Sequence, residues 1–469
     1  MKPSQIIDTL EKKGHTCFYT GGFVRDHILL GIQAKDIDLV TSATPEQLKT
    51  IFSKSKVEEV GKSFGVLIID GTEVATYRKD IYTKNELTVE FGSSLEEDSR
   101  RRDFTFNAIG MDKAGKYYDY HGGLFDYGAG LIRFIGDPNT RIEEDPNRIL
   151  RACRFFAFLT EKAKRQFRFE KNTLKALKMN SSIVLDIDKE RIHKEIITTL
   201  STTQKASLFF IAIKKIGILS HVFPSIDHTI GVLQNRYHAE DLFTHSMLVG
   251  DSISTKYPIL KLVGYLHDVG KVRTKEFLSS VGDYTFYDHE TAGAKIVEKE
   301  LVGLKFSNFE IDKITSLIKE HMRGLKNLLS DSKGFRKALN KFELLKINYR
   351  DYIRIRIADR QGKLVTVCPP IVVPYSISEI RKLLLGFKGV HERGEPTSEL
   401  SLAITGFDIM DTLKTVPGPL VGKVKKDLLA LVIEDPTLNT RDNLLKLVYK
   451  LHSTKMLPPP PKINTNFPV

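Results

Sequence analysis

The chain has 469 residues, which is long enough for several domains that each bury a hydrophobic core. Hydrophobic residues make up 41% and charged residues 28% of the sequence, a balance typical of globular proteins, so disorder of the whole chain is excluded. Lys and Arg number 71 against 58 Asp and Glu, and the net charge of +13 favours a polyanionic partner such as nucleic acid. A basic chain without such a partner is a common alternative.

The cysteines Cys17, Cys153 and Cys368 are scattered and lack the spacing of a zinc site or a disulfide framework, so we expect a reducing, cytoplasmic setting. No apolar run is long enough for a signal peptide or a membrane span. We therefore expect no membrane partner.

The first quarter of the chain mixes helical and strand patterns. Ile6, Ile7 and Leu10 have helical spacing and predict a helix over residues 4–14. Short β-rich runs follow at residues 17–19, 37–40, 65–69, 74–77 and 88–91. This alternation predicts an α+β or α/β head domain over about the first 135 residues.

From about Asp145 onward, apolar residues keep helical spacing almost without interruption, so the remaining three quarters is predicted to be all-helical. We expect a break at Pro369, Pro370 and Pro374. The prolines at 458–461 open a tail that we expect to be disordered or extended.

Gly21 and Gly22 stand between a predicted strand and the apolar run at residues 28–30. Glycines let the backbone approach a phosphate closely, and the N-terminus of a following helix attracts negative charge. A plain structural turn explains a lone glycine pair more often than a phosphate site does, so this pattern alone is weak.

Asp36 and Asp38 lie two positions apart at the head of a predicted strand, where residues i and i+2 project from the same face. Two adjacent carboxylates repel each other, and bound Mg²⁺ would relieve that repulsion. Two such ions could activate a 3′-hydroxyl and stabilise a pyrophosphate leaving group. A lone Asp-x-Asp is usually a solvated turn, and the Gly-Gly turn upstream is what favours a site here.

These residues form a recognisable series. The segments Gly21-Gly22-Phe23-Val24-Arg25-Asp26, Asp36-Ile37-Asp38-Leu39-Val40-Thr41 and Ala43-Thr44-Pro45 resemble the head motif of class II tRNA nucleotidyltransferases and bacterial poly(A) polymerases. That family belongs to the polymerase β superfamily. The resemblance implies an α+β, polymerase β-like head with a mixed sheet, in which Asp36 and Asp38 are catalytic and bind Mg²⁺. Glu73 is a candidate third carboxylate.

Two further segments match motifs of the same family. Arginines such as those of Arg100-Arg101-Arg102-Asp103 suit phosphate recognition, although a run of arginines is more often a solvated surface. Asp145 and Arg148 are predicted to share one helix face, where a simple salt bridge is the usual outcome. The resemblance implies instead that this pair reads the incoming base. The implied nucleotide-binding residues are Gly21, Gly22, Arg25, Arg101, Arg102, Asp103, Asn107, Asp145, Arg148, Arg151 and Arg154.

A second constellation lies in the helical body. His267 and Asp268 end an apolar helix, and further His and Asp residues punctuate neighbouring segments, which predicts a metal site rather than isolated core histidines. The set resembles the HD-type phosphohydrolase superfamily, in which Ni²⁺, Mn²⁺, Co²⁺ or Mg²⁺ activates water against a phosphoester. The resemblance implies His245, His267, Asp268 and Asp359 as ligands, and His289 and His321 as further ligands or phosphate contacts.

The resemblance implies five regions: a catalytic head (1–137), a neck for nucleotide selection and RNA binding (138–224), an HD domain (225–365), a C-terminal helical tRNA-binding region (366–455) and a disordered tail (456–469). It also implies addition of C, C and A to the 3′ end of tRNA from CTP and ATP. Residues 60–66 resemble the tRNA-specific members, but the loop after Thr76 is short and lacks the family's Arg-Arg pair at residues 82–86.

Several alternatives therefore stay open. Within the family they are CC-only or A-only addition, or poly(A) synthesis. Outside it they are a phosphohydrolase with a nucleotide-sensing head, and a pure RNA-binding module. The sequence indicates no oligomeric state.

Overall fold

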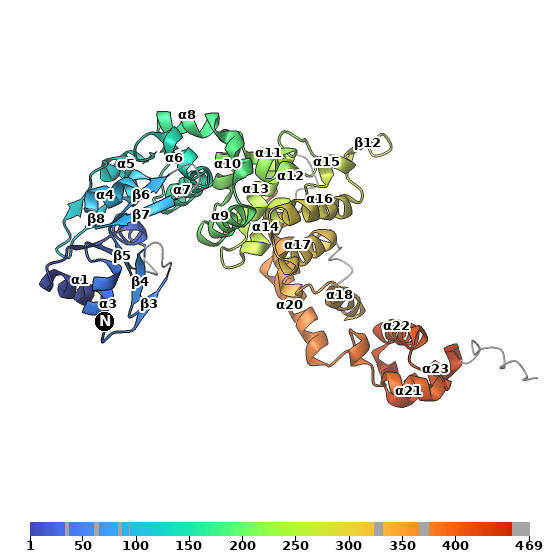
Figure 1. Cartoon of the computed structure of the whole chain (residues 1–469). Coiled ribbons are helices and arrows are strands. Elements are labelled where there is room, and N and C mark those ends of the chain that lie inside the picture. Colours follow the sequence, from blue (N-terminus) through green and yellow to red (C-terminus); the bar gives the residue numbers. More distant parts are fainter. Residues whose placement is uncertain are drawn as a thin grey trace, which may run out of the picture. The chain divides into compact units, whose positions relative to one another are not determined.

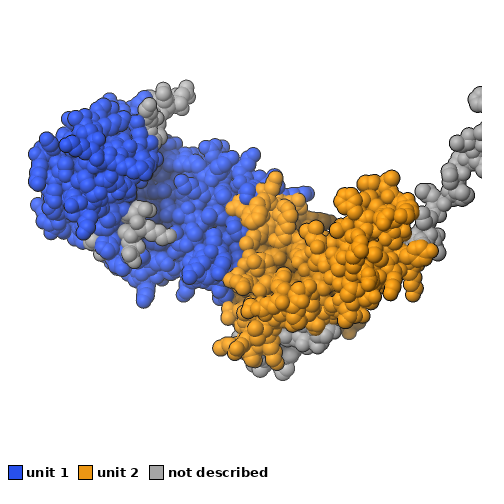
Figure 2. Space-filling view, turned by 90° about the horizontal axis from the view of Figure 1, so that it is seen from below, with its two compact units in different colours: residues 1–233, 241–265, 299–307 blue, residues 234–240, 266–298, 308–469 orange. Residues whose placement is uncertain are grey.

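A computed structural model of the chain describes residues 1–32, 37–60, 65–82, 87–92, 94–322, 332–364 and 375–452 (Figure 1). Several predictions fall outside these residues: Asp36, the stretch at 61–64, the loop at 83–86, Cys368, the proline break at 369–374 and the tail at 456–469. The chain forms two compact units (Figure 2). Unit 1 comprises residues 1–233, 241–265 and 299–307, and unit 2 comprises residues 234–240, 266–298 and 308–469.

Unit 1 begins with a seven-stranded mixed sheet in the order β3-β4-β5-β2-β1-β8-β9. Strand β2 pairs with β5 in parallel, and the other neighbouring strands run antiparallel. The strands are β1 (Cys17–Tyr19), β2 (Asp38–Thr41), β3 (Val57–Glu59), β4 (Val66–Ile69), β5 (Thr72–Thr76), β8 (Gly110–Met111) and β9 (Tyr117–Tyr118). The head is thus the α+β domain with a mixed sheet that the sequence predicts.

Helices α1 (Pro3–Lys12) and α3 (Pro45–Ile51) pack on this sheet, and Ile6 and Leu48 share one buried cluster with strand residues such as Val74. Helix α3 begins where it does because of its cap. The hydroxyl of Thr44 accepts a hydrogen bond from the Gln47 N–H (3.3 Å), and the Gln47 side chain accepts one from the Thr44 N–H (2.8 Å).

Shorter elements complete the head. They are α2 (Gly21–Phe23), the π-helix η1 (Val24–Leu29), the hairpin of β6 (Arg78–Tyr82) and β7 (Leu87–Phe91), α4 (Leu95–Arg100), the 3-10 helix η3 (Thr105–Asn107), α5 (Gly123–Ala129) and β10 (Leu131–Ile132). The apolar helix expected at residues 28–30 is therefore the end of η1.

The rest of unit 1 is helical, with one exception. Strand β11 (Arg168–Phe169) returns to pair in parallel with β10. The helices are α6 (Pro138–Glu144), α7 (Arg148–Lys162), α8 (Lys171–Met179), η4 (Ser181–Asp186), α9 (Lys189–Thr202), α10 (Ser207–Lys215), α11 (Leu219–Val222), α12 (Pro224–Asp227), α13 (Leu242–Ser252) and most of α14 (Pro258–Leu266).

The described residues of unit 2 are also helical, apart from a hairpin of β12 (Glu276–Leu278) and β13 (Asp283–Thr285) that the sequence prediction missed. Its helices are α15 (Lys271–Thr274), most of α16 (His289–Gly303), α17 (Asn308–Glu320), α18 (Ser332–Leu344), α19 (Tyr349–Gln361), α20 (Ile377–Glu392), η5 (Glu399–Ser401), α21 (Gly406–Leu413), α22 (Pro419–Glu434), η6 (Pro436–Leu438) and α23 (Arg441–His452). None of the described helices is long and apolar enough to cross a membrane.

Candidate active sites

The head of unit 1 contains an open cleft of about 520 Å³ at the start of β2. Its lining comes from the Gly-Gly turn, from β2 and β5, from the arginine-rich segment and from the region where α7 begins. Among the lining residues are Gly21, Gly22, Arg25, Asp38, Glu73, Arg101, Arg102, Asp103, Asn107, Asp145, Arg148, Arg151 and Phe155. The structure thus gathers all the described candidates for nucleotide binding except Arg154.

Gly21 and Gly22 lie directly against the carboxylate of Asp38. Gly21 has a φ of +60°, in the left-handed region that favours glycine. A Cβ atom built on Gly21 would lie 3.3 Å from Oδ2 of Asp38, and one on Gly22 would lie 3.4 Å from the same oxygen. The turn therefore needs glycines both for its backbone conformation and for its close approach to Asp38.

Glu73 is the register partner of Asp38 across the parallel pair β2 and β5. Register partners in a sheet project their side chains from the same face, and both residues line the cleft. The cleft thus holds at least two neighbouring carboxylates, those of Asp38 and Glu73. The sequence analysis named Glu73 only as a candidate.

The buried carboxylate of Asp98 fixes two of the three consecutive arginines. Arg101 Nε lies 2.9 Å from Oδ1 of Asp98, and an Arg102 guanidinium nitrogen lies 3.2 Å from Oδ2. Arg102 also donates a 3.1 Å hydrogen bond to the carbonyl of Asn107. Arg100 instead pairs with exposed Glu96. Only one member of the arginine run is therefore a solvated surface charge.

Asp103 stands at the centre of a polar network on the floor of the cleft. It accepts hydrogen bonds from Arg151 Nε (2.8 Å), from Asn107 Nδ2 (2.9 Å) and from the Phe104 N–H (2.8 Å). Asn107 Oδ1 in turn accepts from Arg25 (2.8 Å). Burial alone would raise the pKa of Asp103, but the Arg151 charge and these hydrogen bonds lower it to about 2.

Asp145 and Arg148 do not share a helix face, which corrects the sequence prediction. Helix α6 ends at Glu144, Asp145 has an extended backbone (φ −149°), and Arg148 is the first residue of α7. Arg191 lies 2.9 Å from Asp145, and Arg148 lies 2.7 Å from Glu144, so the two residues have different partners. Both still line the cleft, where they present an acceptor and a donor.

Phe155 is a lining residue that the sequence reasoning did not select. The guanidinium carbons of Arg25, Arg151 and Arg154 lie 4.9, 5.6 and 4.3 Å from the centre of its ring. Arg154 is bound to Glu195 at 2.6 Å and, among the described residues, is not part of the cleft lining. In the sequence, Phe155 stands close to Arg151 and Arg154, and this proximity is the signal that could have predicted the packing of arginines on its ring.

A second polar cluster lies in unit 2, around the buried carboxylate of Asp268. His289 Nε2 and His321 Nε2 lie 3.1 and 3.3 Å from its Oδ1, and His267 Nε2 lies 3.2 Å from its Oδ2. His267 Nε2 also lies 3.8 Å from Asp359. His267, Asp268, His289, His321 and Asp359 are thus five predicted ligands that belong to unit 2. The sixth predicted ligand, His245, is a buried residue of α13 and forms a possible metal-binding group with His267 and Asp359.

Backbone carbonyls hold two of these imidazoles in place. His289 Nδ1 lies 2.7 Å from the carbonyl of Phe286, and His321 Nδ1 lies 2.6 Å from that of Ile318. Such contacts make Nδ1 the donor and direct Nε2 toward Asp268. Both histidines are therefore oriented as metal ligands are.

The donors of this cluster fit a divalent metal ion. His267, Asp268 and His321 each offer a ligand atom, and these atoms lie within 4.8 Å of one another. Burial would raise the pKa of Asp268, but the neighbouring charges of His267 and Lys271 and the hydrogen bonds of His267 and His289 keep it well below its usual range. An ionised carboxylate among imidazoles suits a transition metal.

Close backbone packing brings the parts of this cluster together. A Cβ atom on Gly270 would lie 2.0 Å from the carbonyl oxygen of His289 and 2.5 Å from the backbone nitrogen of Gly293. The segment after Asp268 therefore touches the backbone of α16 directly. This contact sets the separation between Asp268 and His289.

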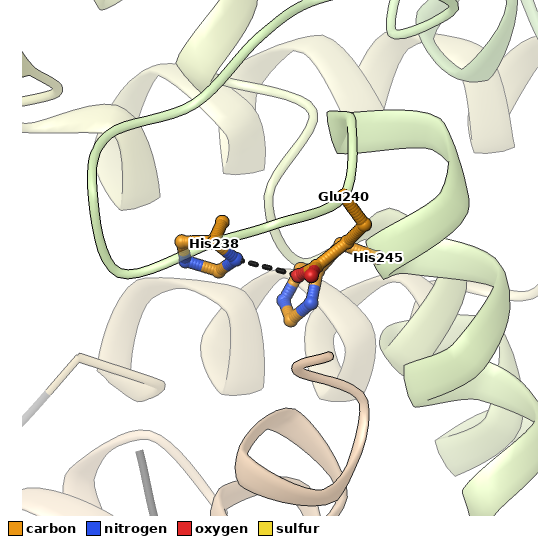
Figure 3. Close-up of side chains that lie close together, drawn as sticks. All are labelled: His238, Glu240 and His245. Carbon is orange, nitrogen blue, oxygen red and sulfur yellow. Dashed lines mark hydrogen bonds and ion pairs between the residues drawn. The ribbon is translucent and has the colours of Figure 1, made fainter. Parts of the chain in front are cut away.

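Beside the cluster, unit 2 holds a cavity of about 450 Å³ whose lining includes Asp268, His289, Asp359 and His238. Nδ1 of His238 lies 2.8 Å from Oε1 of the buried Glu240 (Figure 3). The other carboxylate oxygen of Glu240 accepts a hydrogen bond from the Leu364 N–H. The sequence reasoning missed this His–Glu pair.

Three regions of the chain match known families. Residues 17–133 match the "Poly A polymerase head domain", residues 166–230 match the "Probable RNA and SrmB- binding site of polymerase A", and residues 226–354 match the "HD domain". The CCA-adding enzyme of Ligilactobacillus salivarius is 40% identical over 202 residues, and that of Bacillus licheniformis is 37% identical over 198 residues. Each alignment covers 41% of this chain and 48% of the relative, so the chain matches about half the length of these relatives.

Solved structures show the same fold over nearly the whole chain. The CCA-adding enzyme of Bacillus stearothermophilus in complex with CTP has a TM-score of 0.66 at 22% identity and covers 97% of this chain and 99% of its own. The CCA-adding enzyme of Thermotoga maritima complexed with tRNA has a TM-score of 0.52 at 19% identity and covers 96% of each chain.

A polymerase β-like head, whose cleft sets a Gly-Gly turn against strand carboxylates, is thus followed by a helical body with an HD domain. The chain thus matches, in order, the models of a poly A polymerase head domain, of an RNA-binding segment of polymerase A and of an HD domain.

Proposed function

We propose that the chain adds C, C and A to the 3′ end of tRNA from CTP and ATP without a nucleic-acid template. The observation that carries the proposal is the cleft of unit 1, where the carboxylate of Asp38 meets the Gly-Gly turn and the anchored arginines. The named relatives are CCA-adding enzymes, and solved structures of the same fold include complexes with CTP and with tRNA.

In this proposal Asp38, Asp36 and, as a third carboxylate, Glu73 hold Mg²⁺, which would lower the charge barrier to attack on the triphosphate when bound. The 3′-hydroxyl of the RNA loses its proton to solvent and its oxygen bonds to the α-phosphorus. The bond from that phosphorus to the bridging oxygen of the β-phosphate breaks, and pyrophosphate leaves. The glycine turn leaves room for the phosphates beside Asp38.

The basic residues and the polar network bind the rest of the nucleotide. Arg102 and Arg25 contact phosphates, because Asp98 and Asn107 already hold their guanidinium groups in place. Asp103, kept ionised by Arg151, accepts a hydrogen bond from a ribose hydroxyl. Gly21, Gly22, Arg101 and Asn107 complete the proposed nucleotide-binding set, and Arg154 supports it through Phe155.

Asp145 and Arg148 choose the base. Asp145 can accept a hydrogen bond and Arg148 can donate one, and separate anchors at Arg191 and Glu144 hold the two groups apart instead of pairing them. A fixed donor and acceptor can pair with the edge of C or of A and leave other bases unsatisfied.

The test uses purified protein, a tRNA transcript that ends at the discriminator base, and labelled CTP, ATP or both, with products sized on a gel. CCA addition predicts two added nucleotides with CTP alone and three with both. One product of two nucleotides under both conditions would indicate CC-only addition. Addition only to a tRNA already ending in CC would indicate A-only addition, and long ladders with ATP would indicate poly(A) synthesis.

The five-region division stays part of the proposal: head 1–137, neck 138–224, HD domain 225–365, tRNA-binding region 366–455 and tail 456–469. Cytoplasm is the proposed compartment, because tRNA is the proposed partner and the few scattered cysteines favour a reducing setting.

For unit 2 we propose a phosphohydrolase activity. The observation that favours it is the convergence of His267, His289 and His321 on Asp268 beside a cavity. With Asp359 and His245 they would hold Ni²⁺, Mn²⁺, Co²⁺ or Mg²⁺, which activates water when bound. Water attacks the phosphorus of a phosphate ester, the ester P–O bond breaks, and the alcohol leaves with a proton. Release of phosphate from a phosphate ester that is lost in His267→Ala tests this.

A further inference from the structure

A short segment at the start of α13 places two imidazoles and a carboxylate together (Figure 3). His238, Glu240 and His245 each offer one ligand atom, and these atoms lie within 4.8 Å of one another. The side chains of His238 and Glu240 are 5% and 1% exposed, and His245 is fully buried. A buried carboxylate beside two imidazoles is a donor set that divalent transition metal ions favour.

The N-terminal cap of α13 fixes Glu240 relative to His245. The carboxylate of Asp241 accepts hydrogen bonds from the Thr244 N–H (2.9 Å) and from the Gly231 N–H (2.8 Å). The N–H of His245 donates to the carbonyl of Asp241 (3.0 Å), so His245 lies one turn beyond the cap. Glu240 directly precedes the cap. Local hydrogen bonds within one short stretch of chain therefore set the positions of these two ligands.

Two contacts orient the carboxylate of Glu240. Its Oε1 lies 2.8 Å from Nδ1 of His238, and its Oε2 accepts a hydrogen bond from the Leu364 N–H (3.0 Å). The N–H of His238 donates to the carbonyl of Asn235 (3.0 Å), which fixes the backbone of the third ligand. The carboxylate is therefore oriented before an ion binds, and such outer contacts strengthen metal binding.

The three ligands are accessible from solvent and differ from those around Asp268. His238 lines the open cavity of about 450 Å³, which gives an ion a route to the group. Among the residues that the structure describes, His238 and Glu240 belong to none of the metal-type groups that contain His267. His245 is shared, because it also forms a group with His267 and Asp359. An imidazole has two ring nitrogens, so one histidine can contact two ions.

We propose that His238, Glu240 and His245 bind a divalent transition metal ion of the Zn²⁺ class, in addition to the ion proposed at Asp268. Two imidazoles and one carboxylate leave a fourth coordination position for water, as in zinc sites with three protein ligands. With three ligands, the group binds its ion more weakly than the larger Asp268 cluster does. The proposal does not depend on phosphohydrolase activity. Its rival is that His238 and Glu240 form only an ion pair that stabilises the loop.

Metal counting separates these two readings. The full chain is equilibrated with solutions of buffered free Zn²⁺, and bound zinc per chain is measured by plasma mass spectrometry. Glu240→Gln keeps an acceptor oxygen for His238 but is a poor metal ligand, so it should bind one Zn²⁺ fewer than the wild type at saturation. Its affinity for that ion should fall at least roughly 100-fold, the upper range for loss of a group that only orients a ligand.

Two further variants control for the hydrogen bond and for charge. His238→Asn keeps an N–H donor for Glu240 but lacks an imidazole nitrogen, so it should also lose one Zn²⁺. Glu276→Gln removes an exposed carboxylate of β12 and should bind as much zinc as the wild type. If Glu240→Gln and His238→Asn bind as much zinc as Glu276→Gln, the three residues are not a metal site.

A second measurement needs no variant and so does not depend on whether the variants fold. Crystals of the wild-type chain soaked in Zn²⁺ are measured at the zinc absorption edge. The proposal predicts an anomalous peak about 2.0–2.2 Å from ligand atoms of His238, Glu240 and His245, separate from any peak at Asp268. Peaks at Asp268 without one at Glu240 would overturn it. A wild-type chain that hydrolyses no phosphate ester but shows the Glu240 peak would still support it.

Discussion

Asp38 and Glu73 are register partners on the parallel strands β2 and β5, and both side chains line the cleft of unit 1. This relationship makes Glu73 a structural equal of the carboxylate that the Gly-Gly turn contacts. Substitution of each residue can therefore test whether both carboxylates bind the proposed metal ions.

Asp38→Ala should lower nucleotide incorporation by roughly 100-fold or more, because it removes a carboxylate that balances the charge of the metal ions. Glu73→Gln should lower kcat with little change in tRNA affinity, measured by filter binding. Glu90→Gln, an exposed glutamate on β7, is the matched control and should leave incorporation unchanged. If Glu73→Gln were as active as this control, Glu73 would not be a third ligand.

Asp145→Ala and Arg148→Ala should increase misincorporation of GTP or UTP roughly 10-fold relative to correct addition, because each removes one hydrogen bond that distinguishes the bases. The structure adds a milder variant. Arg191→Ala frees the side chain of Asp145 without touching the nucleotide, so it should relax selectivity by a smaller factor. Single-nucleotide extension assays with each NTP measure the ratio.

Lys194→Ala serves as the control for Arg191→Ala, because it removes an exposed cation from the same helix, α9. A change of selectivity in Lys194→Ala equal to that in Arg191→Ala would mean that net charge, and not the position of Asp145, is responsible.

Asp103 predicts an acid-sensitive head. Its pKa is about 2 in the folded chain and about 3.9 in an unfolded one, so the unfolded state binds more protons as the pH falls between these values. The stability that the Asp103–Arg151 pair provides is complete above about pH 4 and is lost as the pH falls toward 2, by roughly 2–3 kcal/mol. Asp103→Asn should therefore flatten the loss of unfolding free energy over this range, as measured by urea titration. A loss as steep as that of the wild type would contradict the assignment.

Chelation should remove both proposed activities, and a ligand substitution should then separate the two units. Dialysis against EDTA should abolish both proposed activities, and restoring Mg²⁺ should restore nucleotide addition. His267→Ala should lose phosphohydrolase activity and most of the tightly bound transition metal, measured by plasma mass spectrometry, while nucleotide addition stays within about twofold. Full metal content in His267→Ala would exclude His267 as a ligand.

Local patterns in the sequence predict the head well. The β-rich runs at 17–19 and 88–91 become β1 and β7 almost residue for residue, because alternation and turn residues define short strands. The buried faces of the helices likewise follow from apolar spacing. The hairpin β12–β13 was missed because its strands have three residues each and its rings are exposed, so no buried alternation marks it.

Helical and strand spacing does not predict which residues of the site contact one another. Spacing places Asp145 and Arg148 on one helix, but Asp145 is extended and Pro146 follows it, and a residue before proline disfavours helical geometry. Partners distant in sequence, such as Asp103 with Arg151, are set by packing and not by periodicity. Residue types and order identify the site, and tertiary contacts decide which of its members touch.

The close backbone contact at Gly270 leaves no room for a side chain. A methyl group there would push the backbone of α16 away and carry His289 with it, although every ligand would keep its identity. Metal affinity in unit 2 therefore depends on an empty space as much as on donor atoms. A substitution at Gly270 would therefore weaken the site although every histidine and aspartate of the cluster is unchanged.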